Sequence, residues 1–272
     1  MIQKRSRVRG ITLPPKIHFI DDRAKSDRVI TKYFDPMYLD DIKNGRFRFG
    51  TNRVYRRGLE CVSASGVLDD EMEGDLIFDF NCLPSYVEDF STPIFKAKKS
   101  ITPSINVKFV WYINDHTFCA TYGEYDLHHH IAMVSGVREE NFEYRGNSSY
   151  TAFCEIDFKK FLRGTMRQAK LKRNRRMIDR RLPAALAGRV HYDSAFKAVT
   201  YHGFLPKNYN YKSDSYAHYV RAAFSKDIRF SVEREIRVVT PLFDIGRTPL
   251  DAGAEFYQSS LLKESVVRIG FL

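Results

Sequence analysis

The sequence lacks the short motifs that mark several common nucleotide and metal sites. It has no Gly-x-Gly-x-x-Gly and no Gly-x-x-x-x-Gly-Lys-Ser/Thr stretch, which disfavours a Rossmann or P-loop site but leaves other nucleotide folds open. The four cysteines (Cys61, Cys82, Cys119 and Cys154) form no Cys-x-x-Cys pair, and no His-Glu-x-x-His is present. The sequence therefore predicts no metal site.

Long apolar runs are also missing. None approaches the roughly 20 residues that a membrane-spanning helix needs, so we expect no membrane contact. The basic stretch Lys4–Arg9 is not followed by the apolar segment of a signal peptide. Cys119 and Cys154 lie in apolar, strand-like runs, which is typical of buried thiols in a reducing compartment. Together these features predict a cytoplasmic protein.

Three consecutive histidines, His128, His129 and His130, are the remaining feature that suggests a metal. The side chains of adjacent residues diverge, whereas a metal site needs ligands that converge on one point. The run therefore favours a cluster at the surface or at a helix end.

Positive charge is concentrated in one segment. Twelve basic residues and a single acidic residue, Asp179, lie between Lys159 and Arg189, and this segment accounts for the formal net charge of +11. Such a block is expected for a polyanion partner, and tyrosines such as Tyr192 and Tyr201 that follow it can stack on bases. A solvated helix or an acidic partner protein are the alternatives. The predicted nucleic-acid contacts are Lys170, Lys172, Arg173, Arg175 and Arg176.

Hydrophobic patterning predicts an α+β fold with a mixed sheet and flanking helices. Residues 1–27 are expected to form a basic, irregular arm, and residues 28–272 a single domain that carries a basic helical segment, 158–189. Asp35 and Pro36 are typical of a helix start, with Met37, Leu39 and Ile42 on its inner face. The predicted strands are 28–34, 46–50, 76–80, 105–113, 117–122, 150–157, 189–192, 230–239 and 265–271, and the predicted helices are 35–44, 158–181 and 213–224.

The alternation of Phe230–Val239 is central to the functional hypothesis. In a strand, Glu233 and Glu235 share one face and lie about 6–7 Å apart, so one carboxylate can hold a sugar hydroxyl while the other approaches a second group. A half-buried antiparallel strand with a solvated polar face shows the same alternation, and an exposed pair of Glu235 and Arg237 contributes little stability. Both interpretations stay open on the sequence alone.

Several short motifs follow one another along residues 28–271. They are Lys32-Tyr33-Phe34, Gly45-Arg46-Phe47-Arg48-Phe49, Asp69–Gly74, Phe118-Cys119-Ala120, Phe224-x-Lys226 and Glu233-x-Glu235-x-Arg237. In this order the motifs resemble a broad bacterial family of unknown function. This chain departs from the family pattern at Glu71, where the family has proline, and at Phe230, where the aromatic residue before the glutamate pair is displaced.

The same order of motifs is similar to the ADP-ribosyltransferase fold, a split sheet in which an early strand grips NAD and a late Glu-x-Glu strand does the chemistry. The resemblance implies that Glu235 binds the ribose 2′-hydroxyl and that Glu233 orients or deprotonates the acceptor. It also implies that Tyr33 stacks on nicotinamide, that Lys32 or Arg48 binds the pyrophosphate, and that Thr121 binds a ribose or braces Glu235. The alternative is core packing for Tyr33 and ordinary strand structure for Thr121.

The sequence thus predicts an NAD-dependent ADP-ribosyltransferase that modifies RNA or DNA, as a toxin or phage-defence effector with NAD as substrate. An antitoxin or acidic regulator is a possible partner. The alternatives are a nucleic-acid-binding protein without enzymatic activity and an ADP-ribosyltransferase that acts on a protein.

Overall fold

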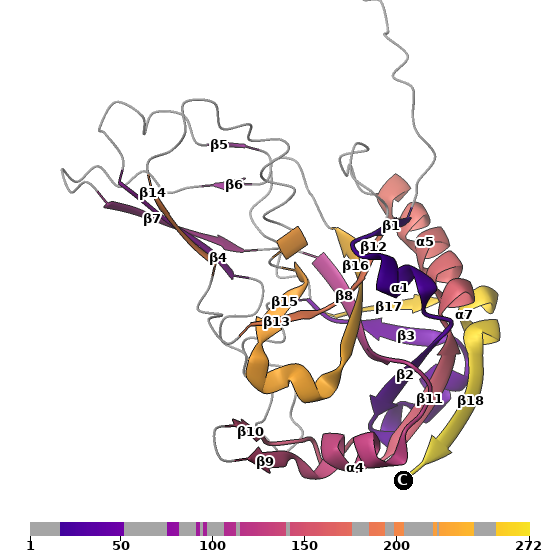
Figure 1. Ribbon diagram of the computed structural model, residues 1–272. Coiled ribbons are helices and arrows are strands. Elements are labelled where there is room, and N and C mark those ends of the chain that lie inside the picture. The colour runs from indigo at the N-terminus through magenta and orange to yellow at the C-terminus, as the bar shows by residue number, and fades with distance from the viewer. Residues whose placement is uncertain are drawn as a thin grey trace, which may run out of the picture.

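The computed structural model describes an α+β fold built around a seven-stranded mixed sheet (Figure 1). The strand order is β1-β12-β16-β8-β2-β11-β18, with β1 parallel to β12 and every other neighbouring pair antiparallel. The residues described are 17–51, 75–81, 91–92, 95–96, 106–112, 115–139, 142–175, 185–193, 199–203, 220–221, 223–241 and 254–272. The seven strands are β1 (Ile17–Phe19), β12 (Ala185–Arg189), β16 (Glu235–Pro241), β8 (Asp115–Tyr122), β2 (Val29–Phe34), β11 (Ala152–Asp157) and β18 (Val266–Phe271).

Smaller sheets and helices surround this sheet. The paired strands are β10 (Phe142–Tyr144) with β9 (Val137–Glu139), β13 (His191–Asp193) with β15 (Ser225–Asp227), β17 (Glu255–Gln258) with β3 (Arg46–Phe49), and β5 (Ser91–Thr92) with β6 (Phe95–Lys96). A three-stranded sheet has the order β14 (Val199–Gly203), β4 (Asp75–Asn81) and β7 (Asn106–Tyr112). The helices are α1 (Asp22–Ser26), η1 (Pro36–Tyr38), α2 (Leu39–Lys43), α4 (Leu127–Ser135), α5 (Phe158–Arg175), η3 (Ile228–Glu233) and α7 (Ser260–Ser265).

The main hydrophobic core lies on one face of the seven-stranded sheet. Alternate residues of the strands, such as Ile30, Phe118 and Ile236, point into it because side chains two apart in a strand share a face. Phe161 of α5 packs edge-on against Phe47 of β3, with ring centroids 5.1 Å apart. This face, covered by α5, α7 and β3, is called the α5 face below (Figure 1).

The other residues of the same strands form the opposite face, called the η3 face below. Thr31, Thr121 and Glu235 lie in one row across β2, β8 and β16, since they are register partners. Two smaller apolar clusters cover this face, one around Phe224 and one around Tyr33 with side chains of α4 and η3. Because both faces are covered, polar side chains on the η3 face are buried rather than solvated.

Most of the predicted elements are confirmed. The strands predicted at 28–34, 46–50, 76–80, 105–113, 117–122, 150–157 and 265–271 correspond to β2, β3, β4, β7, β8, β11 and β18. Asp35 accepts a hydrogen bond from the Met37 backbone N–H, as its capping role requires. Met37 itself is 74% exposed, so its predicted place on the inner face is wrong.

Several predicted boundaries differ from the structure. The basic segment predicted to be helical over 158–189 ends in a strand, since its last residues form β12 (Ala185–Arg189). Residues 17–26, assigned to the arm, form β1 and α1, because Asp21 caps α1 and also accepts from the Arg189 backbone N–H of β12. The rest of the predicted arm, residues 1–16, lies outside the described residues. The strand predicted at 189–192 is divided between β12 and β13 at Val190. The helix predicted at 213–224 lies largely outside the described residues.

The continuous strand predicted for Phe230–Val239 is wrong in its first half. Residues 228–233 form the 3-10 helix η3, and β16 begins only at Glu235. Between them, Arg234 adopts the left-handed conformation with φ 45° and ψ 47°. The chain therefore turns sharply at Arg234, and the alternation of apolar and charged residues does not reveal this turn. Within the described part of the chain, no helix is both long and apolar enough to cross a membrane.

Candidate functional site

Four charged side chains meet on the η3 face at the start of β16. Lys226 Nζ lies 2.8 Å from Glu233 Oε2 and 3.4 Å from Glu235 Oε2. Arg237 holds Glu235 from the other side, with Nε 2.7 Å from Oε1 and Nη2 3.2 Å from Oε2. The exposed fractions of Lys226, Glu233, Glu235 and Arg237 are 6%, 8%, 4% and 0%. We call these four residues the charge cluster.

The charge cluster keeps Glu235 ionised. Burial alone would raise the pKa of this carboxyl, but the positive charges of Arg237 and Lys226 outweigh burial and hold the pKa well below its usual value. A hydrogen bond from the Cys119 thiol lowers it further. A buried charge is costly unless it is paired, and two carboxylates against two cations satisfy that condition. Glu235 is therefore held in place and is negatively charged at neutral pH.

The corner before β16 is held by three consecutive backbone carbonyls. The carbonyl of Val232 accepts from His129 Nε2 at 2.6 Å. The carbonyl of Glu233 accepts from Thr121 Oγ1 at 2.9 Å, and that of Arg234 from the Tyr122 backbone N–H at 3.0 Å. These bonds stabilise the left-handed Arg234, a conformation that side chains with a Cβ rarely adopt. The corner brings Glu233 and Glu235 to the same ammonium group.

His129 connects this corner to the central sheet by hydrogen bonds. A carbonyl can only accept, so Nε2 carries the proton and Nδ1 accepts from the Tyr33 hydroxyl, 2.9 Å away. Burial lowers the pKa of His129, which favours this neutral form, and burial raises the pKa of Tyr33, which keeps its hydroxyl protonated. The pair therefore links β2 to η3 through α4.

The structure brings some predicted site residues together and separates others. Glu233, Glu235 and Thr121 meet, and Thr121 braces the backbone of Glu233 rather than the side chain of Glu235. Tyr33 is 3% exposed, and its ring packs 4.5 Å from that of His130. In this arrangement its ring has no open side on which nicotinamide could stack.

Lys32 and Arg48, the predicted pyrophosphate ligands, lie away from the glutamates. Lys32 alternates with Tyr33 on β2 and points to the α5 face, where its Nζ is 5.6 Å from the Phe118 ring centroid. Arg48 lies on β3 between Phe47 and Phe49, and the side chains of these two phenylalanines pack into the core of the α5 face. The two basic residues and the charge cluster are thus on opposite faces of the sheet.

The basic segment is described in part. Lys170 is exposed on α5, with Lys159, Lys160, Arg163 and Arg167 exposed on the same side of that helix. The backbone of Lys172, Arg173 and Arg175 belongs to α5, but the structure does not describe their side chains. Arg176 lies outside the described residues. At the helix start, Asp157 accepts from the Lys160 backbone N–H, as expected for a cap.

The histidine run is at a helix end, as predicted, but His129 and His130 are buried rather than at the surface. His130 Nε2 bonds to the Tyr150 carbonyl at 2.6 Å, so both rings are engaged in packing and hydrogen bonding. Among the residues that the structure describes, no group of three or more histidine, cysteine or acidic side chains could hold a metal ion.

No functional role was predicted for Lys226 or His129, and Arg237 was considered only as the partner of Glu235 in an exposed pair. Lys226 and Arg237 stand within the quoted motifs, and Arg237 follows Glu235 at the two-residue spacing that places both on one strand face. The predicted pair of Glu235 and Arg237 is formed, but it is buried rather than exposed. No such spacing marks His129, because its contact with Val232 spans 103 residues of sequence.

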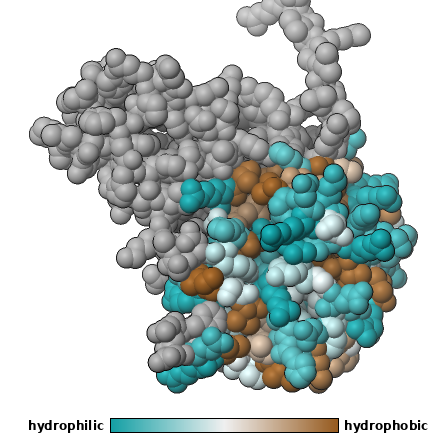
Figure 2. All heavy atoms as spheres, viewed as in Figure 1, coloured by the Kyte–Doolittle hydropathy of each residue, from teal (hydrophilic) through white to brown (hydrophobic). Residues whose placement is uncertain are grey.

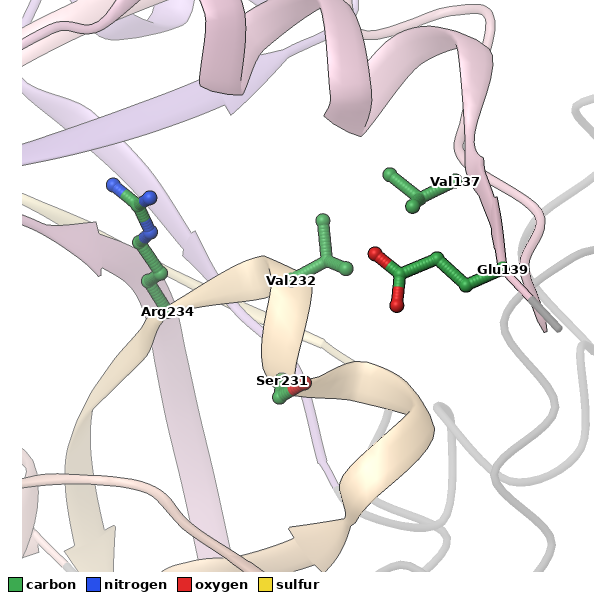
Figure 3. Close-up of a pocket in the computed structure, with 5 residues that line it drawn as sticks. All are labelled: Val137, Glu139, Ser231, Val232 and Arg234. Carbon is green, nitrogen blue, oxygen red and sulfur yellow. The ribbon is translucent and has the colours of Figure 1, made fainter. Parts of the chain in front are cut away.

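A shallow pocket of about 320 Å³ lies beside the charge cluster, between β9 and η3. Val137, Glu139, Ser231, Val232 and Arg234 line it. Figure 3 shows the Glu139 carboxylate facing Val232 across the pocket while Arg234 points away from it. None of the predicted site residues lines this pocket. Among the described residues of its lining, Glu139 is the one carboxylate, without a second acid beside it.

Comparisons with protein-family models, with curated proteins and with solved structures find no match to this chain. The resemblances proposed on sequence motifs therefore stay predictions.

Replacing Thr121 tests the corner. Thr121→Val removes the hydroxyl and leaves the buried Glu233 carbonyl without this donor, which should lower the free energy of unfolding by about 1–3 kcal/mol. Thr121→Ser keeps the hydroxyl and should lose clearly less. Urea unfolding of both variants measures the difference. Equal losses for Val and Ser would show that the hydrogen bond does not hold the corner.

Acid titration tests the charge cluster. The pKa of Glu235 is depressed in the folded protein, so its stabilising effect is present above the usual value of 4.5 and is lost as the pH falls below it. Glu235→Gln removes the titrating group. Urea unfolding between pH 6 and about pH 3 should show a shallower acid loss in the variant. Parallel curves for parent and variant would contradict the depressed pKa.

Proposed function

We propose that this protein is an NAD-dependent ADP-ribosyltransferase whose chemistry lies at Glu235 and Glu233, with nucleic acid as acceptor. The observation that carries the proposal is the convergence of the two glutamates at the buried start of β16, across a corner in the chain. They are held there by Arg237 and by Thr121, which gives a catalytic group the rigidity it needs. The proposed role is that of a toxin or phage-defence effector.

The reaction breaks the bond from ribose C1′ to the nicotinamide nitrogen, and the electron pair leaves with the nitrogen. Positive charge develops on the ribose, where a fixed carboxylate stabilises the transition state more than the ground state. Glu235 suits this role because Arg237 holds it in place and it is ionised at neutral pH. Glu233 then orients the attacking atom of the acceptor and takes its proton as the new bond to C1′ forms.

Nucleic acid as the acceptor is supported by α5. Its exposed side carries five basic residues, and Figure 2 shows hydrophilic residues over the region of α5. Such a row of cations neutralises a phosphate backbone. These residues are Lys159, Lys160, Arg163, Arg167 and Lys170, which we call the basic stripe.

Two observations favour the second candidate, a nucleic-acid-binding protein without enzymatic activity. The charge cluster is balanced, two negative against two positive, as in a purely structural network. It also lies on the opposite face of the sheet from the basic stripe, so binding and chemistry are not forced into one site. The two candidates make different predictions for Glu235.

Transfer of label from NAD distinguishes the candidates. Parent protein is incubated with labelled NAD and, separately, total RNA, single-stranded DNA and lysate protein. Label should move to a nucleic acid, and Glu235→Gln should reduce the rate by roughly 10²–10³-fold through loss of transition-state stabilisation. Glu139→Gln, on the nearby pocket rim, is the matched control and should transfer label like the parent.

Label on lysate protein alone would indicate a protein acceptor instead. No transfer by the parent to any pool would overturn the transferase and leave the binding protein. A thermal melt of Glu235→Gln separates loss of catalysis from loss of fold.

Charge reversal tests the basic stripe. Arg163→Glu with Arg167→Glu should weaken RNA and DNA binding and reduce the magnitude of the slope of log K against log salt by roughly 1.4–1.8, the value for two phosphate contacts. Lys25→Glu with Lys43→Glu reverses the same number of exposed charges on α1 and α2 and should change the slope little. Equal slopes for the two double variants would argue against phosphate contact at α5.

A further inference from the structure

The ammonium group of Lys226 is enclosed by an anionic and aromatic frame. Besides the two carboxylates at 2.8 and 3.4 Å, the Phe230 ring lies with its centroid 4.4 Å from Nζ. Two negative charges and the face of an aromatic ring are the groups that recognise a compact cation. Lys226 therefore occupies a site whose chemistry would equally suit a cation from outside the chain.

The frame is held by contacts that do not involve Lys226. Glu235 is fixed by Arg237, and the backbone of Glu233 by Thr121. The helix that carries Phe230 is anchored at one end by the Asp227 cap and at the other by His129. Movement of the long side chain of Lys226 would open the frame while these contacts remain in place.

Departure of the ammonium would leave two carboxylates against one guanidinium. The frame would then be one negative charge in excess, and an incoming cation would restore the balance. The reaction proposed above brings such a cation, since the nicotinamide ring of NAD is a pyridinium before the bond breaks. With Lys226 in place, that ring and the lysine compete for the same carboxylates.

We infer that Lys226 is an intramolecular occupant of a subsite for a compact organic cation, bounded by Glu233, Glu235 and Phe230, and that the cationic end of the substrate displaces it. The existence of the subsite rests on the geometry of the frame. Its assignment to the nicotinamide end rests on the proposed function.

The test compares the binding of 1-methylnicotinamide, a pyridinium cation, with that of neutral nicotinamide. Removing the competing ammonium in Lys226→Ala should tighten binding of the cation on the order of tenfold or more, because the parent offers an open subsite only in the fraction of molecules whose lysine has left. Neutral nicotinamide should gain clearly less, because it also enters the vacated space but brings no positive charge to the two carboxylates. Calorimetric titration measures both.

Two further variants keep the test decisive. Lys226→Gln retains an amide donor toward Glu233, so it replaces Lys226→Ala if that variant does not fold, with the same gain expected. Phe230→Leu combined with the lysine variant removes the aromatic wall and should lose part of the gain. Equal affinity of parent and lysine variant for the cation, or an equal gain for neutral nicotinamide, would overturn the inference.

The outcome is separable from that of the label-transfer experiment. Tight binding of the cation by the lysine variant without any label transfer by the parent would leave the subsite standing and remove the transferase. Label transfer by the parent without a gain in the variant would do the reverse.

Discussion

The ion pair between Arg237 and Glu235 is the interaction on which the neighbouring structure depends. Both side chains are buried in the middle of a sheet that is covered on two faces. Bringing one such charge out of water costs several kcal/mol, and removing one partner of a buried pair costs about 3–5 kcal/mol. The pair tolerates burial because two hydrogen bonds join it and because Arg237 also donates to the Ala223 carbonyl at 2.8 Å. Arg237 thereby ties β16 to the segment that leads into Lys226.

The corner at Arg234 follows from the same constraint. Glu233 has to reach the ammonium that Glu235 already contacts, and the left-handed residue between them makes this possible. Three carbonyls in succession are bonded to side chains or backbone of α4 and β8, so the strain of the corner is offset by contacts from distant parts of the chain. The Tyr192 hydroxyl accepts a further hydrogen bond from the Glu235 backbone N–H, 2.8 Å away.

The seven-stranded sheet separates a buried group of charges from an exposed one. The η3 face holds the balanced charge cluster, and the outer side of α5, beyond the opposite face, carries the basic stripe. A balanced cluster has little long-range field, whereas five like charges along one helix attract polyanions at a distance. The proposed binding of nucleic acid and the proposed chemistry at the glutamates therefore involve separate parts of this fold, and separate mutations test them.

The sequence by itself determined the local elements of this protein, and only the tertiary structure decided where their polar side chains lie. Alternation and β-branched residues were sufficient for β2, β8 and β11, and the Asp-Pro pair for the helix start at residue 35, because these signals act over a few residues. The pairing of Glu233 with Glu235 was also foreseen, although the continuous strand expected to produce it was not formed. The corner at Arg234 depends on hydrogen bonds from Thr121 and His129, more than 100 residues away in the sequence. The separation of Lys32 from Glu235 and the insertion of Lys226 between the glutamates depend on strand register and on burial by distant segments, and no local pattern encodes them.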